Sequence, residues 1–155
     1  MWRNYLTLRL RPSSAGQQTN LYGGSMQRIF LTQFMLVGFG GFIGSGLRFT
    51  LQSWVQRTVT FTHFPLGTLS VNVLGCLLIG YLGGLAEHRQ ALDASMRLFL
   101  LVGVLGGFTT FSTFAYESLL MAQTSQFFGM LLNVLLQVTI GFSAAWVGMT
   151  AARLL

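Results

Sequence analysis

Long apolar runs alternate with short polar connectors along most of the chain. Four apolar segments stand out, at residues 29–55, 66–86, 98–121 and 127–152. A helix rises about 1.5 Å per residue, so about 20 residues cross the ~30 Å hydrocarbon core of a bilayer. Each segment is long enough to span. The pattern therefore predicts an all-α membrane protein with four transmembrane helices and both termini on one side of the membrane.

The first 25 residues do not follow this pattern. They hold Arg3, Arg9 and Arg11, no acidic residue and no long apolar run. Such a composition is typical of an Arg-rich targeting segment, or of upstream sequence translated from an early start codon. Met26 directly precedes the first apolar run. We therefore expect residues 1–25 to be a disordered or non-native extension, and residues 26–155 to be the membrane domain.

The third apolar segment contains residues that disturb a membrane helix. From Gly103 to Phe114 its sequence is Gly-Val-Leu-Gly-Gly-Phe-Thr-Thr-Phe-Ser-Thr-Phe. Glycines loosen the backbone, and hydroxyl side chains compete for its carbonyl groups. Irregular backbone at membrane depth is tolerated only where it is buried in protein or lines a watery cavity. The segment is therefore predicted to form the wall of a pathway, as in a channel or transporter subunit.

Composition narrows the class of protein. Only 8% of the residues are charged, whereas soluble domains have roughly 25%. The net charge of +6 comes from nine arginines that are scattered along the chain, a distribution that argues against nucleic-acid binding. Cys76 is the only cysteine, so we expect a small buried side chain rather than a reactive thiol. The acidic residues and both histidines lie mostly in connectors, which argues against an enzyme.

Small residues predict close helix packing. Three of the four segments contain the Gly-x-x-x-Gly spacing, which places two glycines on one helix face and lets another backbone approach. The pairs are Gly40/Gly44, Gly80/Gly84 and Gly103/Gly107. Four helices are few for enclosing a pathway, so we also expect the chain to form oligomers.

Single polar side chains within the spans are candidates for function. Arg48 is either an interfacial anchor or a positive charge at a vestibule that attracts anions. Asn72 could hold an anion with its amide or bridge two helices. Glu117 is a candidate vestibule residue, arginine partner or, less favoured, proton-coupling carboxylate. Asn133 and Gln137 lie four residues apart on one helix face, as a polar track or as a tie between helices.

Phe111 and Phe114 lie three residues apart among four hydroxyl side chains. Core packing is the usual role of two phenylalanines at this spacing. However, aromatic rings have a positive edge, and edges turned toward a pathway would stabilise a small anion as it loses water. The setting of the pair favours this second interpretation.

From Met26 onward the chain resembles the CrcB/Fluc fluoride channels, small four-span proteins that export fluoride. The resemblance covers most of residues 26–152, in the family's order and spacing. Its motifs are Arg48-Phe49 after a glycine-rich first span, Gly67-Thr68-Leu69-Ser70-Val71-Asn72, and Gly106-Gly107-Phe108-Thr109-Thr110-Phe111-Ser112-Thr113-Phe114 followed by Glu117. The last of these motifs is highly specific.

The resemblance implies an antiparallel, dual-topology homodimer in a bacterial inner membrane, with passive fluoride pathways along the subunit interface. It implies that the third helix is broken near its middle. It assigns the pathway to Asn72, Phe111, Ser112, Thr113 and Phe114, and the vestibule to Arg48 and Glu117. A structural sodium ion at the dimer centre is expected on the backbone carbonyls of Gly106 and Thr109.

Two features differ from the family pattern. The fourth span of relatives often carries a hydroxyl-rich track, whereas the same face here presents Asn133, Gln137 and Gly141. In addition, more arginines lie on the terminal side of the spans than on the opposite side, which disfavours insertion in both orientations. This bias is smallest if translation starts at Met26, so we expect a chain that starts there to insert equally in both orientations.

Two other functions are compatible with four spans. A small multidrug exporter needs an acidic residue deep in the membrane, but Glu117 is the only acidic residue within any span. A structural membrane subunit would explain the glycines but not the cluster of hydroxyl and aromatic residues. The fluoride channel explains both features.

Overall fold

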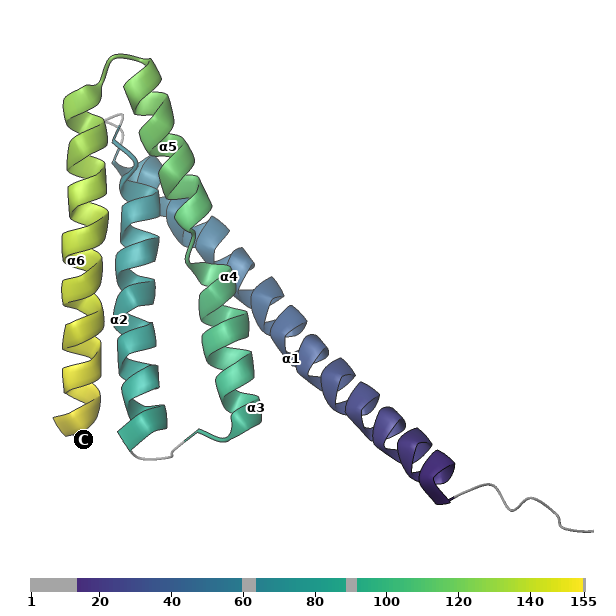
Figure 1. Cartoon of the computed structure of the whole chain (residues 1–155). Helices are drawn as coiled ribbons and strands as arrows, with labels where there is room; N and C mark the ends of the chain where they lie inside the picture. The colour runs from purple at the N-terminus through teal and green to yellow at the C-terminus, as the bar shows by residue number, and fades with distance from the viewer. Residues whose placement is uncertain (1–13, 60–63, 89–91, 155) are drawn as a thin grey trace, which may run out of the picture. The chain divides into compact units, whose positions relative to one another are not determined.

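The computed structural model describes residues 14–59, 64–88 and 92–154. The chain divides into two compact units, residues 1–34 and 35–155, and each is considered by itself. Every regular element in the described ranges is a helix (Figure 1). The elements are α1 (Ser14–Thr58), α2 (Leu66–His88), α3 (Ala94–Arg97), the π-helix η1 (Leu98–Leu105), α4 (Gly106–Phe108), α5 (Phe111–Gln123) and α6 (Phe127–Leu154).

Four stretches are long and apolar enough to cross a membrane, which confirms the predicted all-α membrane fold. They are Met26–Thr58, Leu66–Glu87, Ala94–Gln123 and Phe127–Leu154. Each extends past its predicted bounds by at most a few residues, because a helix continues into the polar interface beyond its apolar core. The third span is built from α3, η1, α4 and α5 together, and it is interrupted between α4 and α5.

The first unit contains the N-terminal part of α1, which begins at Ser14. Residues 1–13 lie outside the described residues. Thr32 donates its hydroxyl to the Arg28 carbonyl at 2.9 Å, and the rings of Phe30 and Phe34 stack with centroids 6.5 Å apart. Because α1 begins at Ser14, helix extends into the segment that the sequence indicates to be an extension. The boundary at residue 26 stays a prediction.

In the second unit, glycines bring α1 close to the third span. A Cβ atom added to Gly40 would lie 2.9 Å from the Gly103 Cα, and one added to Gly107 would lie 2.6 Å from the Gly41 carbonyl oxygen. A Cβ on Gly44 would collide with the carbonyl of Val104. The glycine pairs predicted on these two spans thus face each other at a helix crossing.

Glycines also set the extensive contact between α2 and α6. A Cβ on Gly80 would meet the carbonyl of Ala145, and a Cβ on Gly148 would meet that of Leu77. A Cβ on Gly84 would lie 2.8 Å from the Ala152 side chain. Close backbone approach is the reason for glycine at these positions, which confirms the packing role predicted for Gly80 and Gly84.

Candidate functional site

The third span breaks at Thr109 and Thr110, which are both extended. Thr109 has φ −83° and ψ 157°, and Thr110 has φ −150° and ψ 109°. Helix α4 ends before them and α5 begins at Phe111. The break predicted for the middle of this span is therefore present, and it lies within the cluster of threonines and phenylalanines.

Asn72, on α2, holds the backbone at the break. Its Oδ1 accepts a hydrogen bond from the Thr110 amide at 2.9 Å, and its Nδ2 donates to the Thr110 carbonyl at 3.1 Å. The second Nδ2 hydrogen goes to Gln137 Oε1 on α6, at 3.1 Å. Asn72 thus makes interhelical hydrogen bonds, and both of its amide hydrogens have protein partners in this structure.

The Thr110 side chain caps the N-terminus of α5. Its hydroxyl accepts a bond from the Thr113 amide at 3.3 Å and donates to the Thr113 hydroxyl at 3.0 Å. The Ser112 hydroxyl lies 3.3 Å from the same oxygen. Threonine is a favoured N-cap because its oxygen satisfies one of the free amides of the first turn. Ser112 and Thr113 are therefore tied locally to Thr110.

The break also takes the usual helical donors away from two backbone carbonyls. In a continuous α-helix the Thr110 amide would donate to the Gly106 carbonyl, and the Thr113 amide to the Thr109 carbonyl. Here the first amide donates to Asn72 and the second to the Thr110 side chain. Carbonyl oxygens released in this way are suitable ligands for a hard cation. The residues present therefore fit the sodium site that was expected at Gly106 and Thr109.

Phe111 and Phe114 lie beside the break as an edge-to-face pair. Their ring centroids are 5.5 Å apart and their planes are inclined by 67°. Both line a cavity of about 450 Å³ between α2, α5 and α6, together with Asn72, Thr109 and Gln137. Phe111 is 78% exposed. The predicted aromatic pair and Asn72 thus meet at one cavity, whereas Ser112 and Thr113 are not among its lining residues.

Two carboxamides on α6 extend this polar network. Gln137 accepts a hydrogen bond from Asn72, while its own Nε2 is buried without a partner among the described residues. Asn133 is fully buried and donates to the Ser118 hydroxyl at 2.9 Å. Asn133 therefore ties α6 to α5. Gln137 reaches the cavity as well as tying α6 to α2.

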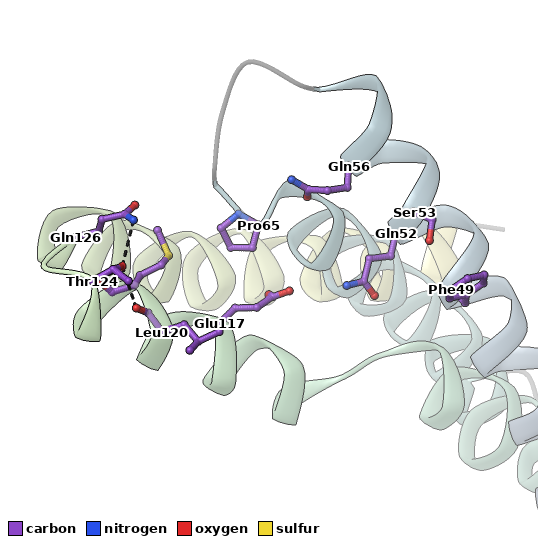
Figure 2. Close-up of a pocket in the computed structure, with 10 residues that line it drawn as sticks. Phe49, Gln52, Ser53, Gln56, Pro65, Glu117, Leu120, Thr124 and Gln126 are labelled. Carbon is purple, nitrogen blue, oxygen red and sulfur yellow. Dashed lines mark hydrogen bonds between the residues drawn. The ribbon is translucent and has the colours of Figure 1, made fainter.

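Glu117 lies at a second cavity, of about 640 Å³, between α1 and α5. Its Oε1 accepts a hydrogen bond from the buried Thr68 hydroxyl at 2.8 Å, and the same hydroxyl accepts one from Gln52 Nε2 at 3.1 Å. Figure 2 shows the side chains of Glu117 and Gln52 pointing toward one another. Arg48 lines neither of these two cavities. The vestibule roles of Glu117 and Arg48 stay predictions.

Three residues of the candidate site had either no assigned role or two alternative roles from the sequence. Thr110 is the residue at which the break is held, but nothing in the local sequence distinguishes this threonine from its neighbours. Thr68 bridges Gln52 and Glu117 from the motif that also contains Asn72. The sequence left two alternative roles open for the helix face that carries Gln137. Its hydrogen bond with Asn72 connects residues far apart in sequence. Only the fold reveals that contact.

Comparison with known proteins adds independent information. The model of the family described as CrcB-like protein, Camphor Resistance (CrcB), matches residues 35–149. A protein of Elusimicrobium minutum named fluoride-specific ion channel FluC is 44% identical over 126 residues, which cover 81% of this chain and 97% of that protein. One of the same name from Nitratidesulfovibrio vulgaris is 41% identical over 124 residues, with coverage of 80% and 99%. Fluoride-specific ion channel FluC 1 of Methanosarcina acetivorans is 39% identical over 118 residues, with coverage of 76% and 88%.

Proposed function

The chain belongs to the CrcB-like protein family, and from this premise we propose that it is a fluoride-specific channel subunit. It is a multi-pass membrane protein, and its relatives are named ion channels rather than enzymes. In our proposal, fluoride leaves the cytoplasm passively through this channel in a bacterial inner membrane. The cytoplasmic fluoride concentration then falls without an energy source in the protein itself.

One observation carries this proposal: an edge-to-face phenylalanine pair stands beside a helix break that is held by neutral amides. Fluoride is small and strongly hydrated, so a selective pathway must replace its water with hydrogen-bond donors and positive ring edges. Conduction also needs binding weak enough to permit release. The cavity of Phe111 and Phe114 contains carboxamide and hydroxyl groups, and no charged residue is among those that line it. Such an arrangement suits rapid transit of an anion.

The aromatic pair is also the reason to propose a homodimer. Phe111 is 78% exposed in the single chain, and large apolar side chains of α1 such as Phe42 are exposed to a similar degree. A second copy that covers the open side of the cavity would close the pathway off from lipid. We propose the antiparallel arrangement of two copies, with one pathway along each side of their interface. Lipid then contacts the remaining apolar faces.

A sodium ion belongs to the same proposal. The carbonyls of Gly106 and Thr109 have lost their helical donors to Asn72 and to the Thr110 side chain. In the proposed dimer, the carbonyls of Gly106 and Thr109 would hold the cation at the dimer centre. When bound, sodium would be attracted to the negative oxygen ends of these carbonyls and would take the place of their lost helical donors. The residues of the chain itself position the carbonyls by holding the break open.

Fluoride efflux from liposomes that contain the purified full-length protein tests the proposed function. We expect rapid loss of fluoride, measured with an ion-selective electrode, and no loss of chloride from matched liposomes. Phe111→Ile, which removes the ring but keeps an apolar side chain, is expected to abolish the fluoride flux. Folded wild-type protein that releases neither ion would refute a channel function. Equal release of both ions would refute selectivity.

A further inference from the structure

Two positions on one face of α2 contact the two extended residues of the break. Asn72 and Gly75 lie three residues apart, so they share a side of the helix. Asn72 bonds the backbone of Thr110. Gly75 meets Thr109, because a Cβ atom added to Gly75 would collide with the Thr109 methyl carbon, Cγ2. The Thr109 methyl therefore occupies the space in which a side chain at position 75 would lie.

Both branches of the Thr109 side chain are held in place. Its hydroxyl donates to the Leu105 carbonyl at 3.0 Å, and its backbone amide donates to the same carbonyl at 3.0 Å. Its methyl lies against Gly75, beside the ring of Phe108. Threonine is stiff at χ1 because it is branched at Cβ. Turning the methyl away from α2 would move the hydroxyl off the Leu105 carbonyl, so this side chain cannot yield to a larger residue at position 75 without cost.

The position of this side chain also sets the direction of the Thr109 carbonyl. Thr109 is the residue at which the backbone leaves the helix, since its amide still bonds one turn back while its ψ of 157° turns its carbonyl out of the helical direction. The side chain and the carbonyl group are attached to the same Cα atom. A displacement of the Thr109 side chain from α2 therefore displaces the carbonyl as well.

We infer that Gly75 is a positioning residue for the proposed sodium site, because it receives the Thr109 methyl and thereby places the Thr109 carbonyl. The inference rests on the sodium ion of the proposed function and deepens it. Both carbonyls are then controlled from one face of α2: Asn72 takes the Thr110 amide away from Gly106, and Gly75 places Thr109. Without the cation, Thr109 can shift away from a larger residue at position 75. With the cation bound, its carbonyl is held, so the strain remains and weakens binding.

The melting temperature of the purified full-length protein in detergent tests the inference. It is measured against sodium chloride concentration, with choline chloride keeping the ionic strength constant. A ligand that binds only the folded protein raises this temperature, and the dependence gives an apparent dissociation constant. Gly75→Ala inserts a methyl group into the contact with Thr109. Gly80→Ala is the matched control, because it inserts the same group into a similarly tight contact on the same helix, against the carbonyl of Ala145.

We expect Gly75→Ala to raise the apparent dissociation constant for sodium at least about tenfold, which is the lower part of the cost of overpacking a filled contact, converted to an equilibrium constant. Gly80→Ala should lower the melting temperature in the absence of sodium, but its dissociation constant should stay within about twofold of wild type. An unchanged constant in Gly75→Ala, or an equal change in both variants, would overturn the role of Gly75.

Thr109→Ser tests the same contact from the other side, and it decides the matter even if Gly75→Ala does not fold. It removes only the methyl and keeps the hydroxyl that bonds Leu105. Alone it should raise the dissociation constant about two- to fourfold, the effect of one lost methyl contact; an unchanged constant would overturn the inference.

The double variant provides a rescue that general destabilisation cannot imitate. In Gly75→Ala combined with Thr109→Ser, the alanine methyl fills the space that the threonine methyl has left. The dissociation constant should therefore return to within about threefold of wild type. A double variant that binds sodium no better than Gly75→Ala would overturn the inference. Wild-type protein that sodium does not stabilise relative to choline would instead overturn the proposed sodium site.

Discussion

Replacing Asn72 with leucine removes, at nearly constant volume, the side chain that holds the break in the third span. The change deletes two hydrogen bonds to the Thr110 backbone and one to Gln137. Thr110 is only 6% exposed, so water does not replace these partners freely. Interhelical hydrogen bonds within membranes contribute about 0.6 kcal/mol each on average, which gives about 2 kcal/mol for three. If the N–H and the C=O of Thr110 were both left without partners, each would cost about 3 kcal/mol, so the upper limit of the stability loss is about 6 kcal/mol.

We therefore expect Asn72→Leu to lower the free energy of unfolding by roughly 2–6 kcal/mol. Denaturant titration in detergent, without fluoride and followed by tryptophan fluorescence, measures this loss. Hydrogen exchange gives a local readout, because the Thr110 amide proton is bonded to Asn72 and should exchange faster in the variant. Asn133→Leu is the matched control. It deletes one recorded bond, to Ser118, and should cost less.

The expected result separates two roles of Asn72. If its only role were to contact fluoride, the substitution would leave stability in fluoride-free buffer unchanged. A loss below about 0.5 kcal/mol, the range of ordinary surface changes, would refute the clamp at the break. Unchanged exchange at Thr110 would refute it as well.

Two further predictions concern packing and topology. Gly80→Ala should destabilise the protein by about 1–3 kcal/mol, because its Cβ would meet the carbonyl of Ala145. Gly83→Ala is the control: no atom lies within 4 Å of its Cβ, so the change should be neutral or stabilising. Thermal unfolding measures both variants, and equal effects would refute the packing argument. A chain that starts at Met26 should show its termini on both sides of the membrane when labelled with a membrane-impermeant reagent, and label on one side only would refute dual insertion.

The apolar pattern predicted the spans because helices in lipid must be apolar along their length and satisfy their own backbone. The glycine pairs also predicted real contacts, since only a residue without Cβ fits where Gly80 meets Ala145. The π-helix from Leu98 to Leu105 was not predicted. Its sequence is apolar throughout, so residue type does not distinguish a π-helical from an α-helical register there.

The site could be predicted only in part for a related reason. Threonines, glycines and phenylalanines close together in one segment indicated irregular backbone, and the family resemblance implied that the third span is broken near its middle. Which backbone group leaves the helix, however, depends on Asn72 reaching Thr110 from another span. The hydrogen bond from Asn72 to Gln137 likewise joins separate spans. Relations between side chains of three spans leave no periodic signal along the sequence.

The hydrogen bond from the Thr110 amide to Asn72 links the two kinds of site that we propose. Because this amide donates to Asn72, the Gly106 carbonyl lacks the donor it would have in a continuous helix, and in our proposal this carbonyl binds a cation. The same departure lets α5 begin at Phe111, with the partial positive charge of a helix N-terminus near the aromatic pair. Oxygen ligands and anion-stabilising groups would otherwise require separate irregularities in one membrane helix. In our proposal a single neutral asparagine produces both, so a change that restores continuous helix at Thr110 should remove sodium binding and fluoride conduction together.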